Sequence, residues 1–382
     1  MGYEKYFKEE HNIFRQQFRS FLEKELAPHA DEWEAAGLFP KEVFKQMGDL
    51  GFLGLRYPED VGGMNADYWY SVVFFEEIPR CLSSGVALGL LVQTDMCTPA
   101  INAHGTPEQK DMFLKPAIRG DKIGAICVTE PGAGSDVKAI RTRAVKDGDY
   151  YIINGSKTFI TNGTRADWLT MAVKTNPDRG YGGISLFLFP TDTPGFKVTR
   201  KLHKLGNLAS DTAELSFEDC RVHKKYLLGE ENKGFYYVME GFQFERMAGA
   251  VSGMAGMQLV FEKTLEYCRT REVFGKPVSK WQANSHMLAN LATEMEAAKA
   301  LVYHCADMLN NGENALKEVS MCKLYVGELA QRVVDRCLQM YGGYGYIEEY
   351  YVARAYRDTR LITIGGGSSE VMREIIAGLL NL

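Results

Sequence analysis

The chain lacks the paired cysteines that mark a zinc site or a disulfide framework. Its eight cysteines are scattered over 382 residues, and none forms a Cys-x-x-Cys pair. We therefore expect free, buried thiols in a reducing compartment and no bound metal ion.

Long apolar runs and an excess of positive charge are also missing. No run of 18 apolar residues predicts a membrane span. The net charge is −5 and no long basic stretch occurs, so nucleic acid is not an expected partner. The first ten residues are charged and contain no apolar signal core. We expect a cytoplasmic protein of bacterial type, or a mitochondrial matrix protein if a transit peptide has been removed.

Hydrophobic periodicity divides the chain into three regions, and its length supports two or three domains. Apolar residues recur at helical spacing from residue 3 to residue 119, and strand-like segments with Gly and Pro turns begin near residue 123. After Gly229 the pattern returns to long helices. We predict a mainly α protein with a central β domain. It would comprise an N-terminal helical domain (1–122), a small β-barrel or sandwich (123–229) and a C-terminal four-helix bundle (230–382).

Local signals add detail to this division. The dipeptide Asn154–Gly155 between two strand-like runs predicts a hairpin turn. Thr106 followed by Pro107 predicts a helix start with Pro at the first helical position. An apolar stripe predicts the core of the bundle. Its members are Met287, Leu291, Met295, Ala298, Leu301, Val302 and Cys305.

A glycine-rich turn at Gly132–Gly134 follows a strand-like segment and suggests a dinucleotide fingerprint at first sight. Val137 occupies the place of the third glycine, and no alternation of strands and helices follows. A nicotinamide enzyme is therefore disfavoured, and an ordinary turn is the simpler interpretation of these glycines alone.

Longer motifs carry a more specific signal. The run Val128–Asp136 resembles the flavin-contacting segment of acyl-CoA dehydrogenases, and Asn154–Gly163 resembles the β motif that follows it. Arg271–Pro277 and Gln339–Gly345 are similar to later motifs of that family, in the same order. The resemblance covers essentially the whole chain. Residues 183–246 look most like long-chain acyl-CoA dehydrogenases.

The resemblance implies FAD as cofactor and the family's α-domain, β-domain, α-domain fold. Thr161 would hydrogen-bond near the reactive flavin nitrogen, and Phe159 would pack against the ring where many relatives carry Trp. Because relatives take part of the nucleotide site from a neighbouring subunit, we expect a homo-oligomer, specifically a tetramer. The cofactor-binding residues implied are Ile126, Val128, Thr129, Ser135, Phe159, Thr161, Arg271, Phe274, Gln282, Gln339, Gly343, Ser368 and Glu370.

The catalytic base is not where many relatives carry it. Their loop reads Tyr-Glu-Gly-Thr, whereas Gly366 stands here in place of the catalytic Glu. Glu245 is the replacement that we predict, since long-chain and isovaleryl-type relatives carry their base at this helix position. Its helix face is small and apolar, which would desolvate the carboxylate and raise its pKa. Arg246 lies about 100° round the helix and is not expected to neutralise Glu245.

The triple glycine 365–367 is similar to the loop of isovaleryl- and citronellyl-CoA dehydrogenases, which act on branched chains. Two large side chains are thereby absent beside the acyl carbons, and the Gly366 N–H could hydrogen-bond the thioester oxygen. The simpler alternative is a flexible turn before a helix that starts near Ser368. The substrate-binding residues we predict are Ser135, Tyr236, Phe242, Gln243, Arg246, Gly365 and Gly366.

The expected function is FAD-dependent α,β-dehydrogenation of an acyl-CoA to the trans-2-enoyl-CoA. The acyl group would be of medium or long chain or methyl-branched, and electrons would pass to electron-transfer flavoprotein. Two alternatives stay open at this point. One is an acyl-CoA oxidase that uses oxygen directly, and the other is a non-catalytic acyl-CoA or flavin-binding scaffold.

Overall fold

The structure is a computed structural model that describes residues 2–382. Its N-terminal part is helical, as predicted. Thr106 and Gln109 cap one of these helices reciprocally, each side chain accepting a hydrogen bond from the other's backbone N–H, which confirms the predicted helix start. The elements are η1 (Tyr3–Tyr6), α1 (Glu9–Phe21), η2 (Leu22–Leu26), η3 (Ala27–His29), α2 (Ala30–Ala36), α3 (Glu42–Asp49), η4 (Glu59–Val61), α4 (Tyr68–Glu77), η5 (Ile78–Cys81), α5 (Ser84–Leu91), η6 (Val92–Cys97), α6 (Pro99–His104), α7 (Pro107–Gln109), η7 (Lys110–Leu114) and α8 (Lys115–Ile118).

The middle of the chain forms a β sheet, which confirms the predicted central β domain. The order is β6-β7-β3-β2-β4-β5-β8, and β1 pairs in parallel with β4. Trp168, Phe187 and Phe189 are fully buried in it. The strands are β1 (Gly124–Cys127), β2 (Arg143–Asp147), β3 (Tyr150–Thr161), β4 (Trp168–Lys174), β5 (Ile184–Pro190), β6 (Phe196–Lys201), β7 (Thr212–His223) and β8 (Leu227–Leu228), with short helical turns η8 (Val137–Ala139), η9 (Pro177–Gly183) and η10 (Lys224–Tyr226) between them.

The predicted hairpin at Asn154–Gly155 is wrong. Strand β3 runs through both residues, and the sheet absorbs Gly155 as a register shift against β7. Asn154 does not turn the chain because its side chain pairs with Asp219 on β7, at 2.8 and 3.0 Å. The tight connection lies earlier, between β2 and β3, where Gly148 has a φ of +61°.

The last third of the chain forms the predicted helical bundle around the long helix α9 (Gly234–Thr270). Most of the predicted apolar stripe is buried in it, including Leu291, Ala298, Val302 and Cys305. The remaining elements are β9 (Glu272–Val273), β10 (Lys276–Pro277), η11 (Val278–Lys280), α10 (Gln282–Asn310), α11 (Leu316–Tyr341), η12 (Gly342–Tyr346), α12 (Tyr351–Thr359), η13 (Arg360–Thr363) and α13 (Ser369–Leu379).

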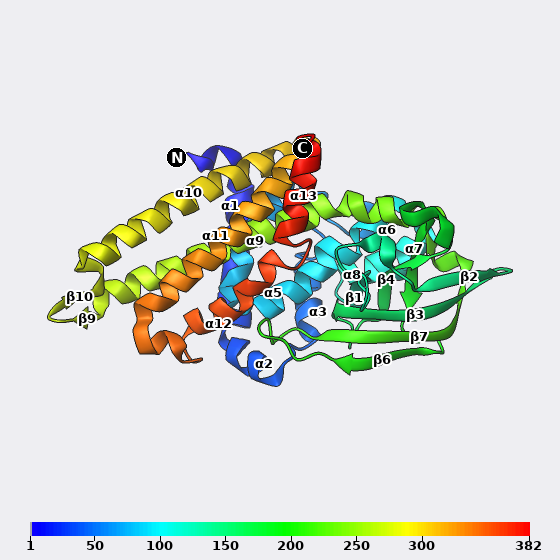
Figure 1. Ribbon diagram of the computed structural model, residues 1–382, viewed down its shortest axis with the longest axis horizontal. Helices are drawn as coiled ribbons and strands as arrows, with labels where there is room; N and C mark the ends of the chain where they lie inside the picture. The colour runs from blue at the N-terminus through cyan, green and yellow to red at the C-terminus, as the bar shows by residue number, and fades with distance from the viewer. Residues whose placement is uncertain (1) are drawn as a thin grey trace.

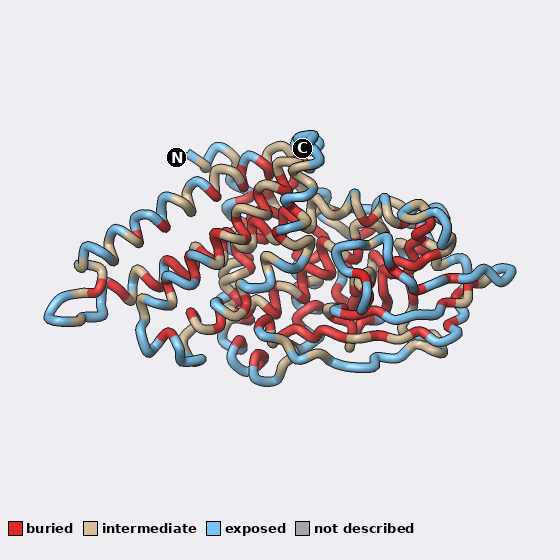
Figure 2. The backbone as a smooth tube through the Cα atoms, in the orientation of Figure 1, coloured by how far each residue is buried: buried red, intermediate tan, exposed pale blue. Residues whose placement is uncertain are grey.

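The molecule is elongated, with the β9–β10 hairpin at one end and the β domain at the other (Figure 1). Helix α9 runs from beside the β domain to that hairpin. Buried residues concentrate in the sheet and where the helices cross, whereas the hairpin end is largely exposed (Figure 2). All eight cysteines are buried and free. Within residues 2–382 no helix is long and apolar enough to cross a membrane, and no group of His, Cys, Asp or Glu could hold a metal ion.

Candidate active site

The predicted base and the glycine loop lie face to face. Glu245 is on α9, and Gly366 lies in the loop between η13 and α13 with a φ of +65°. A Cβ atom built on Gly366 would lie 3.3 Å from Oε1 of Glu245. The carboxylate therefore borders the space that a side chain at position 366 would begin to occupy.

The surroundings of Glu245 suit a carboxyl group that takes up and releases a proton near neutral pH. Burial raises the pKa of Glu245 to about 7. The positive charges of Arg246 and Lys323 oppose that rise, and the negative charge of Asp95 adds to it. The expectation that Arg246 does not neutralise Glu245 is thus wrong in part, because the charge of Arg246 has the largest effect of the three on the pKa of Glu245. Its side chain is buried and cannot reach solvent.

Three buried polar side-chain atoms on α9, the helix that carries Glu245, have no hydrogen-bond partner among the described residues. They are Nε of Arg246, Oε1 of Gln243 and Oγ of Ser252. The Arg246 guanidinium lies 5.2 Å from the centre of the Phe242 ring. Buried polar atoms are rarely left unpaired in native proteins, so we expect a water molecule or a polar ligand to pair with these three atoms.

Tyr236, the remaining substrate-binding prediction on α9, is not part of this cluster. It is exposed and lies nine residues before Glu245, which is about 14 Å along the helix. A ligand that contacts both residues must be long. Gly365 is exposed as well, and a Cβ there would meet only ordinary contacts with Leu361, at 3.5 and 3.6 Å.

A lysine that the sequence analysis missed holds the glycine loop. Lys323 on α11 is buried, and its Nζ donates a hydrogen bond to the carbonyl oxygen of Gly367. On the other side of the loop, Ser368 caps α13 by accepting a hydrogen bond from the N–H of Val371, as predicted for a helix start there. A charge within the apolar stripe of α11 is the signal that could have revealed Lys323. Glu370 is exposed in the first turn of α13.

The flavin motifs meet on the β domain. The N–H of Thr158 donates to the carbonyl of Thr129 at 3.0 Å, which joins the loop after β1 to strand β3. Beneath them, buried Lys157 contacts Oε1 of Glu130 at 2.9 Å and the Val128 carbonyl at 2.8 Å. Glu130 also accepts from the N–H of Thr142. This network fixes the loop after β1 against the sheet.

The side chain of Phe159 is exposed, and its backbone has a rare conformation. Its φ is +60°, at a register shift between Lys157 and Ile160, and 67% of the residue is exposed. A non-glycine residue with positive φ is uncommon, and such strained residues cluster at functional sites. Thr161, Val128 and Ile126 are partly buried nearby on β3 and β1 or the loop after it. Ser135 is exposed on the glycine-rich loop.

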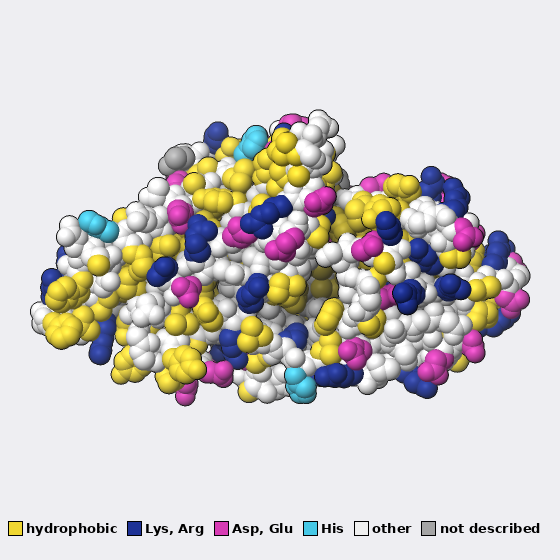
Figure 3. Space-filling model, viewed as in Figure 1, with side chains coloured by type: hydrophobic (Ala, Val, Ile, Leu, Met, Phe, Trp, Pro, Cys, Tyr) yellow, Lys and Arg dark blue, Asp and Glu magenta, His cyan; other side chains and the backbone are white. Residues whose placement is uncertain are grey.

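The predicted nucleotide residues gather at the opposite end of the molecule. Tyr267 and Tyr341 stack there at 4.2 Å, joining the end of α9 to the end of α11. Phe274 is 95% exposed, and the space-filling view has hydrophobic side chains at this end (Figure 3). Within one chain these residues are remote from the flavin motifs (Figure 1). The exposed nucleotide residues are Arg271, Phe274, Gln282, Gln339 and Gly343.

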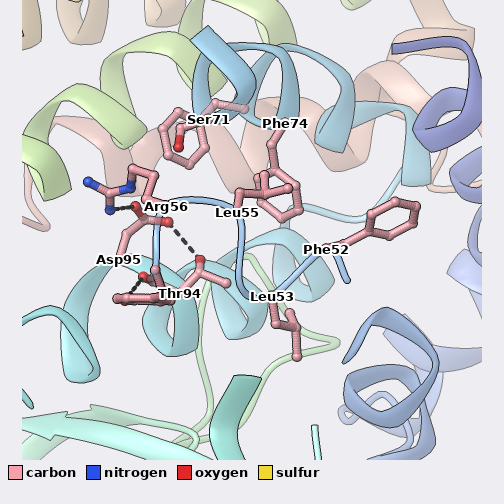
Figure 4. Close-up of a pocket in the computed structure, with 10 residues that line it drawn as sticks. Phe52, Leu53, Leu55, Arg56, Ser71, Phe74, Thr94 and Asp95 are labelled. Atoms are coloured by element: carbon pink, nitrogen blue, oxygen red, sulfur yellow. Dashed lines mark hydrogen bonds and ion pairs between the residues drawn. The ribbon is translucent and has the colours of Figure 1, made fainter. Parts of the chain in front are cut away.

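A buried ion pair lies near Glu245, whose carboxyl group feels the charge of Asp95. Nη2 of Arg56 contacts Oδ1 of Asp95 at 2.6 Å, and the Thr94 hydroxyl donates to Oδ2 (Figure 4). The Arg56 guanidinium also lies 4.8 Å from the centre of the Phe244 ring, next to Glu245 in sequence. Arg56, Thr94 and Asp95 border a cavity of about 20 Å³, which has room for one water molecule.

An exposed aromatic ring on a bulged strand, hydroxyl groups beside it and a carboxyl group with a raised pKa fit a flat redox cofactor and a substrate that loses a proton. These are the features that a flavin-dependent oxidoreductase needs.

Comparisons with known proteins give the family. The models for the acyl-CoA dehydrogenase N-terminal, middle and C-terminal domains match residues 8–121, 125–220 and 232–380. The chain is 41% identical to the mitochondrial long-chain specific acyl-CoA dehydrogenase of Sus scrofa over 99% of this chain and 88% of that protein. It is 39% identical to the caffeyl-CoA reductase-Etf complex subunit CarC of Acetobacterium woodii, over 98% and 99%.

Among solved structures, the acyl-CoA dehydrogenase from Geobacillus kaustophilus matches with a TM-score of 0.96 and 46% identity, covering 99% of both chains. The chain therefore belongs to the acyl-CoA dehydrogenase family, whose members are FAD-dependent oxidoreductases that dehydrogenate acyl-CoA. Its cofactor is FAD.

Proposed function

We propose that this enzyme oxidises the Cα–Cβ bond of a medium-chain, long-chain or methyl-branched acyl-CoA to the trans-2-enoyl-CoA. Electron-transfer flavoprotein is the acceptor we propose. The observation that carries the proposal is the position of Glu245, whose Oε1 borders the empty side-chain position of Gly366. The relative named as part of a caffeyl-CoA reductase-Etf complex supports the choice of electron carrier.

Glu245 would remove the α-proton, for which its pKa of about 7 is suitable, because a base works best when its pKa is close to the working pH. The Gly366 N–H would bind the thioester oxygen. Arg246, Gln243 and Phe242 would line the acyl thioester. Bound FAD supplies the acceptor for the β-hydride. Phe159, Thr161 and Thr129 would hold the flavin, with Val128, Ile126 and Ser135 beside them.

The test is Glu245→Gln, which keeps the volume and removes the base. We expect FAD to stay bound while its anaerobic bleaching by an acyl-CoA slows by about 10²–10⁴-fold. Glu262→Gln is the matched control, since Glu262 is exposed on the same helix, about 25 Å away. Bleaching at the normal rate in Glu245→Gln would refute the assignment.

The same experiment separates the two alternatives. A non-catalytic scaffold would bind acyl-CoA without bleaching of the flavin. An acyl-CoA oxidase would bleach and then recover its colour rapidly in air. The proposed dehydrogenase would recover slowly in air and rapidly with electron-transfer flavoprotein.

We also propose that FAD lies across a subunit contact of a homotetramer. Arg271, Phe274, Gln282, Gln339 and Gly343 would hold the nucleotide half of FAD that is bound mainly by a neighbouring chain. Their exposure, far from the flavin motifs of the same chain, supports this arrangement. Arg271→Ala should weaken FAD retention and assembly together, measured by absorbance and light scattering. A monomer with a full complement of FAD would contradict it.

We propose three finer assignments. Ser368 and Glu370 would approach the cofactor from the start of α13. The domain limits 1–122, 123–229 and 230–382 would describe units of folding. Relatives occur both in bacteria and in mitochondria, so location follows the organism.

A further inference from the structure

Lys323 is a buried cation with little to balance it. Only 4% of the residue is exposed, and its Nζ donates a hydrogen bond to the Gly367 carbonyl. Among residues 2–382 no carboxylate forms an ion pair with it. Burying an ammonium group beside a neutral carbonyl is unfavourable unless an anion lies near. Burial and the positive charge of Arg246 lower the pKa of Lys323 to about 8, and the negative charge of Glu245 opposes that fall, so Lys323 is still mostly charged at neutral pH.

The carbonyl that Lys323 contacts belongs to the loop facing Glu245. Gly366 and Gly367 both have positive φ, +65° and +100°. A Cβ on Gly367 would lie 2.7 Å from Cε of Met372, so the loop packs tightly against α13 at that point. Lys323 ties the same peptide segment to α11. The distance from the loop to the base therefore depends on this one side chain as well as on the cap of α13.

We propose that Lys323 is a positioning residue, which fixes Gly366 and Gly367 opposite Glu245 and keeps a second positive charge beside that carboxylate. The proposal rests on the proposed role of Glu245 as the base. It assigns two separable effects to one side chain, a hydrogen bond that sets geometry and a charge that favours the ionised base.

The charged groups facing Glu245 come from three elements. Arg246 lies on α9 itself, Lys323 on α11 and Asp95 on η6, where Asp95 is paired with Arg56. The two cations thus lower the pKa of Glu245, whereas burial and the paired anion Asp95 raise it. Removing the charge of Lys323 leaves Arg246 alone, so the pKa of Glu245 must rise above about 7. Because the base acts only when ionised, the acid limb of the pH–rate profile must then move to higher pH.

The experiment compares Lys323→Met and Lys323→Gln in the FAD-loaded enzyme, by the pH dependence of anaerobic flavin bleaching with an acyl-CoA. Both variants remove the charge, and only Gln retains a hydrogen-bond donor. We expect the acid limb to move up by about one pH unit in both variants, since a neighbouring charge shifts a pKa by about 1–3 units. The plateau rate at high pH should fall further in Lys323→Met than in Lys323→Gln. Lys317→Met, on the exposed start of the same helix, should leave both quantities unchanged.

An acid limb that stays in place in both variants would overturn the proposal. If Lys323→Met does not fold, Lys323→Gln carries the same test, and loss of folded, FAD-loaded enzyme in both would assign Lys323 to stability alone and also overturn it. Failure of the proposed function is distinguishable, because it would appear as normal bleaching in Glu245→Gln whatever Lys323 does.

Discussion

Two neighbouring glycines should respond in opposite ways to the same substitution. Gly366 has a φ of +65°, and a Cβ there would approach Oε1 of Glu245 to 3.3 Å. Gly365 has no positive φ, and a Cβ there would meet Leu361 at 3.5 Å or more. We predict that Gly366→Ala is damaging and that Gly365→Ala is harmless.

The magnitudes follow from the backbone and from the contact. An alanine in the left-handed region costs about 1–2 kcal/mol of folding free energy. A carbon at 3.3 Å is tighter than ordinary contact, so the Glu245 carboxylate must move by a few tenths of an ångström. Displacement of a catalytic group by about 1 Å lowers a rate by about 10²-fold, so a loss of about tenfold in flavin bleaching is expected. Gly365→Ala should be neutral or stabilise by about 0.4–1 kcal/mol, through the unfolded state.

The assay is anaerobic stopped-flow bleaching of the FAD absorbance, together with thermal unfolding of the same preparations. Gly365→Ala serves as the matched control, since it adds the same methyl group one residue away. Equal effects of the two substitutions on rate and stability would refute the reasoning. They would show that neither the positive φ of Gly366 nor the contact with Glu245 affects the rate or the stability.

Three further predictions concern specificity, pH and the flavin loop. Gly365→Tyr should lower kcat/KM for methyl-branched acyl-CoA about tenfold more than for straight-chain acyl-CoA, measured on a matched substrate pair; equal losses would assign the glycine to the turn. In the unaltered enzyme, bleaching should quicken as pH rises through about 7, because Glu245 acts when ionised; a rate independent of pH from 5 to 8 would contradict this. Lys157→Met should destabilise the protein by about 3–5 kcal/mol, since buried Glu130 loses its cation; urea unfolding without FAD measures it, and a change under 1 kcal/mol would argue against the pair.

Much of the fold could be predicted because its signals are local. The apolar stripe from Met287 to Cys305 needs only helical spacing to identify a buried face, and most of it is buried. Thr106 with Gln109 forms a cap within four residues. The hairpin at Asn154–Gly155 was wrong because the decisive partner, Asp219, lies 65 residues away on another strand. A local turn signal gives no information about a partner on a distant strand, and here that partner keeps Asn154 in the sheet.

For the candidate site, the sequence predicted the residues that can be recognised within one helix or loop. Glu245 could be chosen from its helix face and from the missing loop carboxylate. The charges that act on it come from elsewhere, Lys323 from 78 residues later in the chain and Asp95 from 150 residues earlier. The effect of Arg246 was underestimated because a helical wheel measures direction and not burial. Once both side chains are removed from water, 100° of separation does not prevent their charges from interacting.

The arrangement explains how the Glu245 carboxyl group can titrate near neutral pH inside a largely apolar bundle. Burial alone would hold Glu245 protonated at neutral pH and leave it unable to accept a proton. The two cations acting without burial would keep it ionised and weaken it as a proton acceptor. With Arg246 and Lys323 on one side, and burial with Asp95 on the other, the pKa settles at about 7, where a small change in surroundings shifts the protonation state. In the proposed function an acyl chain binds beside Glu245, where it would remove water and strengthen the charge interactions. The proposed base would therefore be most sensitive to its neighbours when substrate is bound. Lys323 is the neighbour that also contacts the glycine loop, so a change in that loop would reach the charge balance of Glu245 through it.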